Sequence, residues 1–455
     1  MPNLTAFGAT EYMDGALSLS VLNELFLRGE PCDERGRPTR GRALIDNGPD
    51  IEEEDRERRR ECKGLKAIDF TGCVSAVFVN AFTEFVNTHL VPPPEAEYGS
   101  DEEGGGTRRK SRVNFSEPLV FPGLERLGMR GVKSILARSL GPFLLALPNL
   151  THLDLSGTRL TPEILEALGQ SPTMRLKSLA LARCIRLTSE SIRRFLIESP
   201  VSSQLTELNL YGDMTYISPI QPNDLRDIIT LAPCFLSGNL EYLDLSSAPI
   251  DKALLTLFRP QPRLRSLGLS HILHLELKTV TEFVLEKAPN VEILALVNTS
   301  PELDCGIRLP NNDPRSATRQ ASLALHGQVI RPLCHSHSFS TSSTAAPQPS
   351  PSRVRVIELS TGMLGALGAG ADSWRIIRSK GGRGWYVDTA TAWVAEPGSG
   401  GGSVLRRNLP PDHPYRVELC RLSDANGNVC SGVGWHARKM EVGICVLYLT
   451  DRTNL

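Results

Sequence analysis

The stretch Leu150–Leu187, LTHLDLSGTRLTPEILEALGQSPTMRLKSLALARCIRL, decides how this chain folds. It contains the pattern L-x-x-L-x-L twice, beginning at Leu150 and again 26 residues later at Leu176. Between the two copies, Thr161 and Pro162 can begin a helix, because threonine is favoured as an N-cap and proline at the first helical position. Each copy therefore predicts a short strand, a turn and a helix that returns along the outside.

The same pattern recurs along most of the chain. Strict copies begin at Leu22, Leu150, Leu176, Leu205, Leu240 and Leu264, looser copies at Leu65, Leu124, Val291 and Val354, and a degenerate copy at Leu4. From Leu124 to Val291 the successive copies are 26, 26, 29, 35, 24 and 27 residues apart. Most of these steps lie in the range of about 20–29 residues that is typical of leucine-rich repeats. The sequence is therefore identified as a member of that class.

A repeat of this kind predicts a curved solenoid. One strand–turn–helix unit cannot bury its own apolar face, but stacked units share a continuous core. The first, fourth and sixth pattern positions then point into the core, and the third and fifth face the open, concave side of a parallel sheet. We therefore expect an α/β fold: a leucine-rich-repeat solenoid with a curved parallel sheet, outer helices and a small β-rich C-terminal module. The alternative is an ordinary α/β domain with leucine-rich strands, whose spacing would be less regular.

Within that class, the sequence resembles the ribonuclease-inhibitor-like and cysteine-containing repeats. LKSLALARCIRLTSESI, residues 176–192, places Cys184 at the turn, LKAIDFTGC places Cys73 similarly, and LTHLDLSGTRLT has Gly157 near the corresponding site. The resemblance covers residues 124–297 well and residues 4–70 more loosely. Such repeats are similar to those of F-box/LRR proteins, which implies a solenoid that holds a substrate for a ubiquitin ligase. SGVGWHARKMEV, residues 431–442, resembles the tail of fungal leucine-rich-repeat proteins.

The chain departs from F-box/LRR proteins at its N-terminal side. No F-box-like, leucine- and proline-rich helical segment precedes the repeats. Met1-Pro2-Asn3-Leu4 matches Leu147-Pro148-Asn149-Leu150, which leads into a later strand. The chain is therefore expected to begin in mid-repeat, with the F-box, and through it a ubiquitin ligase adaptor, belonging to a region upstream of Met1.

Composition divides the chain into four parts. We expect a solenoid over residues 1–303 with mobile insertions at about 30–63 and 92–118, a disordered insertion over 304–352, a last repeat strand and turn over 353–372, and the β-rich module over 373–455. The insertions are too polar, or too rich in proline, glycine and serine, to fold alone. The module holds all four tryptophans, and its GGRGWY and DANGNV segments are typical of hairpin turns. The tryptophans are expected to form a small core rather than a ligand cage.

The charge balance argues against several classes of function. There are 50 basic and 51 acidic residues, a formal charge of −1, whereas general nucleic-acid binding needs a basic surplus that displaces counterions. No apolar run is long enough for a bilayer span, and no basic-then-apolar signal opens the chain. The ten cysteines include no CxxC pair. We therefore expect neither a nucleic-acid nor a membrane partner, and a cytoplasmic or nuclear protein with reduced thiols.

The sequence offers little for catalysis. Nothing fits GxxxxGK[ST] or GxSxG, and the glycines of LGALGAGADS are more typical of a flexible loop than of a dinucleotide site. Cys334, His335 and His337 lack a second ligand pair for a metal ion. Cys73 and Cys184 are interpreted as residues that pack the turns of their repeats. We therefore expect a protein that is not an enzyme, with no catalytic residues, no cofactor and no metal.

One surface is a candidate for binding. The third and fifth pattern positions place Asp154, Glu207, Asn209, Tyr242 and Asp244 on the concave side of neighbouring or near-neighbouring strands. A mildly acidic patch with one aromatic anchor suits a protein partner that carries a basic or mixed segment. The alternative is that these side chains are merely solvated. The predicted function is a protein–protein interaction module, either the substrate-recruiting part of an F-box-like ubiquitin ligase subunit or a scaffold in cell-wall, cytoskeletal or GTPase regulation.

Overall fold

Short strands recur at the repeats of the pattern. The computed structural model describes residues 6–9, 13–27, 65–91, 119–305, 314–334, 354–378, 383–389, 393–397 and 403–407. The strands of the repeats are β1 (Ala6–Gly8), β2 (Ala67–Asp69), β3 (Arg126–Gly128), β4 (His152–Asp154), β5 (Ser178–Ala180), β6 (Glu207–Asn209), β7 (Tyr242–Asp244), β8 (Ser266–Gly268), β9 (Ile293–Ala295) and β10 (Val356–Ser360).

Helices connect these strands. They are α1 (Leu19–Leu27), α3 (Ala76–His89), α4 (Ala137–Leu145), α5 (Pro162–Gly169), α6 (Ser189–Glu198), α7 (Pro222–Leu231), α8 (Pro233–Leu236), α9 (Lys252–Leu257), α10 (Leu277–Lys287), α11 (Pro314–Ala324), α12 (Arg331–Cys334) and α13 (Thr361–Ala366). Short 3₁₀ helices are η1 (Asp14–Ala16), η2 (Pro200–Ser202) and η3 (Pro301–Leu303), and η4 (Leu325–Ile330) is a π-helix. Each described helix is too short or too polar to span a membrane.

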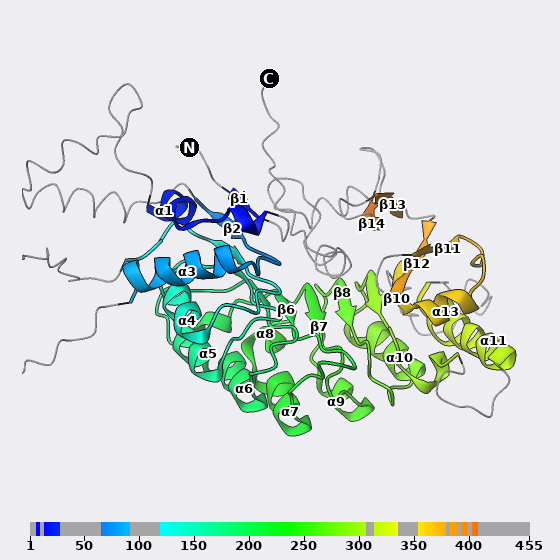
Figure 1. The fold of residues 1–455 in the computed structure, drawn as a ribbon. Helices are drawn as coiled ribbons and strands as arrows, with labels where there is room; N and C mark the ends of the chain where they lie inside the picture. Colours follow the sequence, from blue (N-terminus) through cyan, green and yellow to red (C-terminus); the bar gives the residue numbers. More distant parts are fainter. Residues whose placement is uncertain are drawn as a thin grey trace, which may run out of the picture.

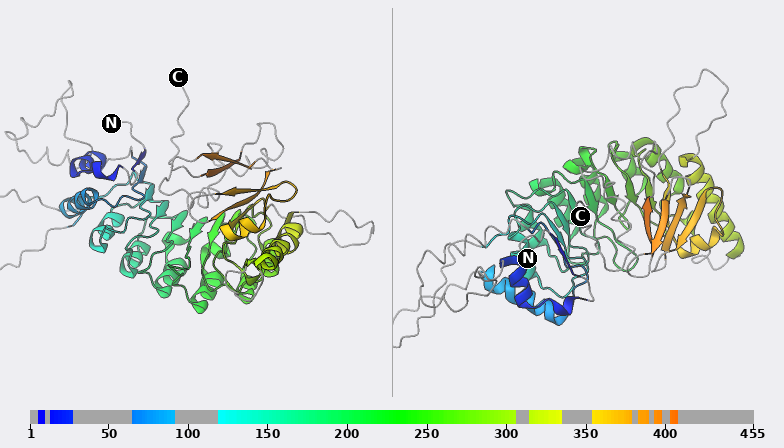
Figure 2. Two further views of the ribbon diagram at one scale, coloured as in Figure 1. Left: turned by 45° about the vertical axis from the view of Figure 1, so that its right-hand side comes forward. Right: turned by 90° about the horizontal axis from the view of Figure 1, so that it is seen from above.

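One sheet joins all the repeats. It runs from β1 to β10 in sequence order, with these strands parallel, and continues into β12 (Arg383–Asp388) and β11 (Trp374–Arg378). The copies at Leu150, Leu176, Leu205 and Leu240 supply the consecutive strands β4 to β7, so the prediction of one strand per repeat is confirmed. Helices α4 to α10 follow the outer side of an arc and the strands its inner side (Figure 1). In Figure 2, β1 and β12 lie at opposite ends of this arc.

The main core lies between the sheet and the helices. Leu208 and Leu243 occupy the central position of β6 and β7, oppose each other in the register and are 0% exposed. Ala180 and Tyr242 form a separate apolar cluster that is not part of this core. Because side chains alternate along a strand, the separate cluster lies on the concave face. The predicted register of inward and outward positions is therefore confirmed.

The strict copy at Leu22 is not a strand, which corrects the prediction for this segment. Leu22 lies in α1, which packs against α3, and the strand of this repeat is β1 from the degenerate copy at Leu4. The spacing explains the error, because apolar residues three and four apart also line one face of a helix. Phe26, expected on the concave face, is instead buried in the core against the rings of Phe85, Phe121 and Phe143.

Part of the predicted disordered insertion, residues 304–352, is a helical segment. Residues 314–334 form α11, η4 and α12, and the buried residues Ala317, Ala321, Leu325, Val329 and Leu333 recur every four positions. In an α-helix this spacing drifts by about 40° at each step, and the wider π-helical turn of η4 offsets the drift. The segment contacts α10, where the Thr281 hydroxyl donates to the Gln328 carbonyl at 2.6 Å. Residues 306–313 and 335–353, and the predicted insertions at 30–63 and 92–118, lie outside the described residues.

The expected C-terminal antiparallel strands are present, but the first two continue the main sheet. β12 pairs antiparallel with both β10 and β11, and β13 (Trp393–Pro397) pairs with β14 (Ser403–Arg407) in a second sheet. Trp374 packs against Tyr386 with ring centroids 5.1 Å apart. Both belong to the main core, which corrects the prediction of a separate small core for this tryptophan. Trp385 is buried in a concave-face cluster with Ile293, Val356 and Val387. The DANGNV segment and Trp435 lie outside the described residues.

Candidate partner-binding surfaces

The register brings the predicted concave residues together. Asp154, Asn209 and Asp244 lie in one row across β4 to β7, with Ala180 of β5 between the first two. Glu207 and Tyr242 oppose each other in the neighbouring row. The five residues therefore lie on the predicted face, and their binding of a partner remains a prediction.

These side chains are more buried than predicted. Glu207 is 4% exposed, Asn209 3%, and Tyr242 and Asp244 0%, while Asp154 is half-buried. The alternative, that these side chains are merely solvated, is wrong for four of the five. A substitution at any of these four changes a buried contact as well as the surface.

Asp154, Asn209 and Asp244, which we call the acidic row, make the same local hydrogen bond. In each case the side-chain Oδ1 accepts a hydrogen bond from the backbone N–H two residues later: Ser156 to Asp154 at 2.9 Å, Tyr211 to Asn209 at 3.1 Å and Ser246 to Asp244 at 3.0 Å. Asp69 accepts from Thr71 in the same way at 2.9 Å. This is the Asx turn, in which a short carboxylate or amide stabilises the bend after a strand. The signal was present in the sequence, because Asp or Asn recurs at the fifth pattern position.

Small residues in the next strand make room for these carboxylates. Gly128 lies beside Asp69 in the register, and Gly268 beside Asp244. A Cβ added at either glycine would overlap the carboxylate of its neighbour. Gly128 and Gly268, at the fifth pattern position of their strands, therefore make room for the carboxylates of Asp69 and Asp244.

Tyr242 is held as a neutral hydrogen-bond donor. Its hydroxyl donates to Oδ2 of Asp244 at 3.1 Å. Burial raises the pKa of Tyr242 well above its usual value, and the nearby carboxylates of Glu358 and Glu207 raise it further. The ring packs on Ala180. Tyr242 of β7 thus contacts Ala180 of β5 and Asp244 of its own strand. These contacts are a structural role that does not depend on a partner.

The turn cysteines pack as predicted. The Cys184 thiol donates to the Leu155 carbonyl of the preceding repeat at 3.1 Å, and the Thr299 hydroxyl makes the same contact to Leu269 at 2.6 Å. Cys73 donates to the Ala9 carbonyl at 3.7 Å. Burial raises the pKa of the Cys73 and Cys184 thiols to about 12, so both stay protonated near neutral pH. Among the described residues, no group of three or more His, Cys, Asp or Glu could hold a metal ion.

The turns after β2 to β5 and after β7 to β9 each contain a residue with positive φ. Glycine occupies this place after β2, β3 and β4, where Gly72, Gly131 and Gly157 have φ of 78°, 77° and 70°. Arg183 takes it after β5 with φ of 57°, and His271 after β8 with φ of 61°. A side chain in this region costs about 1–2 kcal/mol. At the positions of Arg183 and His271, glycine would therefore adopt the same backbone conformation at a lower conformational free energy.

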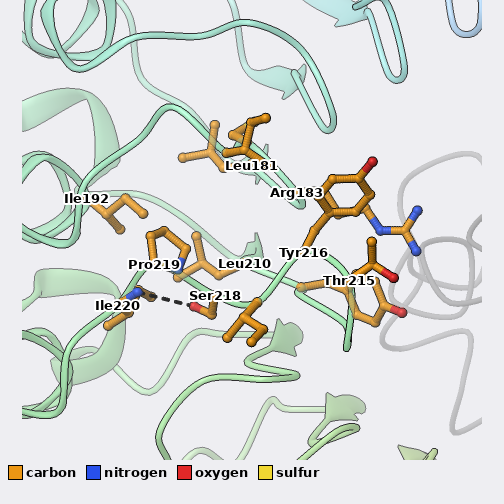
Figure 3. Close-up of a pocket in the computed structure, with 13 residues that line it drawn as sticks. Leu181, Arg183, Ile192, Leu210, Thr215, Tyr216, Ser218, Pro219 and Ile220 are labelled. Atoms are coloured by element: carbon orange, nitrogen blue, oxygen red, sulfur yellow. Dashed lines mark hydrogen bonds between the residues drawn. The ribbon is translucent and has the colours of Figure 1, made fainter.

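A pocket lies beside Arg183. Its volume is about 190 Å³, and it is lined by Leu181, Arg183, Ile185, Ile192, Tyr216 and Ile217, among others. We call it the rim pocket, because it lies between the turn after β5 and the loop after β6. Figure 3 shows Ile192 and Ile220 at one end of it, and Arg183 and Tyr216 at the other. Sequence reasoning missed this pocket, although the 35-residue step from Leu205 to Leu240 marked a longer loop there.

The comparison with known families agrees with the fold. Residues 146–169, which include β4 and α5, match the family model of a Leucine Rich repeat. No curated protein is significantly similar to the chain. The parallel sheet, the outer helices and this match together define an α/β solenoid of leucine-rich repeats.

Proposed function

We propose that this chain is a protein–protein interaction module that binds its partner without catalysing a reaction. One observation supports this most strongly: the third- and fifth-position residues of β4 to β10 form one inner face whose side chains lie outside the main core. Those of β5 to β10 are buried, and His152 and Asp154 of β4 are partly exposed. A solenoid offers such a face as an extended binding surface. Asp154, the partly exposed carboxylate of the acidic row, suits a partner with a basic segment.

In its finer form, the proposal makes the chain the substrate-recruiting part of an F-box-like ubiquitin ligase subunit that acts in the cytoplasm or nucleus. The support is the resemblance of the turns that contain Cys73 and Cys184 to those of F-box/LRR proteins. None of the five described cysteines forms a disulfide, which fits a reducing compartment. A scaffold in cell-wall, cytoskeletal or GTPase regulation is the alternative. Sequencing the transcript upstream of Met1 separates the two, since an in-frame F-box favours the first and its absence the second.

The binding test needs substitutions that leave the Asx turns intact. Changing Tyr242 to Ala or Asp244 to Lys would disturb buried contacts. The double change Asp154→Asn and Asp244→Asn keeps each Oδ1 acceptor for Ser156 and Ser246 and removes two negative charges. At position 244 it also replaces the acceptor of the Tyr242 hydroxyl with an amide group that can donate to that hydroxyl instead. Glu163→Gln, on the fully exposed start of α5, is the matched control for charge loss on the outer side.

Proteins captured by tagged wild-type and variant chains are quantified by mass spectrometry at matched expression. We expect the double variant to capture several-fold less of a partner protein, and the Glu163→Gln control to capture as much of it as the wild type does. The midpoint temperatures of thermal unfolding of the three proteins must agree within a few degrees. Equal capture by the double variant, together with loss in the control, would place the binding surface on the outer helices and contradict the proposal.

A further inference from the structure

The loop after β6 forms one wall of the rim pocket and is held by hydrogen bonds. The loop after β6 begins with Asp213, whose Oδ1 accepts from the backbone N–H groups of Thr215 at 2.8 Å and Tyr216 at 2.7 Å. At its other end, the Ser218 N–H donates to the Ser247 hydroxyl at 3.0 Å. The extra residues of this long repeat are thus fixed at both ends, and they form one wall of the pocket beside the turn after β5.

Large apolar side chains gather at the mouth of the rim pocket. Ile185 and Ile217 are each 69% exposed, Met214 56% and Tyr216 37%. Ile185, Tyr216 and Ile217 line the pocket, and Met214 lies on the loop after β6 beside Tyr216 and Ile217. Single exposed apolar residues are common, but a cluster around a concavity marks an interaction site. These four residues come from the two neighbouring loops only.

Arg183 gives the mouth a positive charge. Its guanidinium lies 5.4 Å from the ring centroid of Tyr211 and 5.9 Å from that of Tyr216, and it pairs with Asp213. The Arg183 side chain is 40% exposed, whereas that of Asp213 is 14% exposed. The charge presented outward is therefore that of the arginine, and Arg186 in the same turn is also exposed. A role in fixing the loop explains the Arg183–Asp213 pair, but it does not explain the exposed isoleucines.

We propose that the rim pocket binds one large apolar side chain of a protein partner, next to an acidic residue that pairs with Arg183. The volume fits this occupant, because an apolar cavity of about 150 Å³ already holds a benzene ring, and the rim pocket has about 190 Å³. Arginine is the side chain best suited to bind a carboxylate through paired N–H groups. This inference rests on the proposed interaction function and adds a second surface, with the opposite charge preference to the acidic row.

The test uses a library of random peptides displayed on phage and selected on the full chain. We expect the selected peptides to share a Leu, Met or Phe next to Asp or Glu. Synthetic copies should bind at least tenfold more weakly to Ile217→Asp and to Arg183→Gly by fluorescence polarisation. The control is Leu323→Asp on α11, where the leucine is 64% exposed against 69% for Ile217. This variant should bind the peptides as the wild type does. Arg183→Gly should fold, because glycine suits the positive φ at this position.

Two outcomes overturn the inference. One is a selection that yields no apolar–acidic consensus, and the other is a set of peptides that bind Ile217→Asp with unchanged affinity. Neither outcome bears on the acidic row, because the test of the proposed function uses different variants and captured proteins. Loss of capture by the Asp154→Asn and Asp244→Asn variant with a failed peptide selection would keep the interaction function and remove the rim pocket from it.

Discussion

At the scale of single residues, particular positions of the repeat pattern make the same structural contact in several repeats. The residue three positions after the sixth-position leucine packs the turn, and either a thiol at Cys184 or a hydroxyl at Thr299 can donate to the preceding repeat. The fifth position supplies the Asx turn through Asp154, Asn209 or Asp244. These side chains hold the backbone of one repeat to the next, so they stabilise the array as well as shape its surface.

The central leucines should carry a large share of the stability. Leu208→Ala or Leu243→Ala removes a fully buried side chain and leaves a cavity in the core. We expect either change to lower the free energy of unfolding by about 2–5 kcal/mol. Leu231→Ala on α7, where the leucine is 53% exposed, is the control and should be nearly neutral. Denaturant unfolding followed by circular dichroism measures the difference, and equal midpoints for all variants would mean that the register is wrong.

The raised pKa of Cys184 should make stability fall at high pH. Its folded pKa is about 12 against an ordinary value of 9.0. The unfolded chain therefore loses this proton first, and the contribution to stability is complete below pH 9.0 and is lost as the pH rises towards 12. Cys184→Thr keeps a donor to the Leu155 carbonyl, as Thr299 does to Leu269, but does not titrate.

The thiol effect is measured as a difference between two proteins. We expect the stability of the wild type relative to Cys184→Thr to fall by on the order of 1 kcal/mol between pH 8 and pH 10. Urea unfolding at a series of pH values reports it, and other groups that titrate cancel in the comparison. A constant difference across this range would show that the thiol is not held protonated by burial.

At the scale of elements, spacing predicted the repeat strands well and the helices less well. The pattern at Leu22 fits a helix face as well as a strand, and only its packing against α3 decides between them. Residues 314–334 were missed because the insertion was judged as a whole, and its serine- and proline-rich end, residues 335–352, outweighed the apolar positions of residues 314–334. Its helix forms because α10 offers a surface that it covers, which a local pattern does not reveal.

The helical segment of residues 314–334 should contribute to stability as the outer layer of its repeat. Leu325→Ala removes a fully buried side chain from η4 and should cost about 2–5 kcal/mol. Leu323→Ala, two positions earlier and 64% exposed, should change stability by less than about 0.5 kcal/mol. Thermal unfolding of the pair tests the packing directly, and similar midpoints would indicate that the segment does not pack on α10.

At the scale of the whole molecule, the sequence predicted which face is concave but not how open it is. The alternation of strand residues was enough to place Asp154, Glu207 and Tyr242 on one side of the sheet. Their burial was not predicted, because a list of positions does not show which side chains contact each other across neighbouring strands. The rim pocket depends on contact between two loops from different repeats, Ile185 on one and Ile217 on the other. Such a site becomes visible only when the repeats are stacked.

Hydrogen–deuterium exchange of the full chain, with and without a partner captured by the wild type, tests the central claim most directly. We expect partner-dependent protection in β4 to β7 and in the loops after β5 and β6, at amides of the strands and turns. The outer helices α5, α6 and α7 should exchange at the same rate in both samples. Protection confined to those helices, or no protection anywhere in the repeats, would contradict the claim that the chain binds a protein through the inner face and rim of its solenoid.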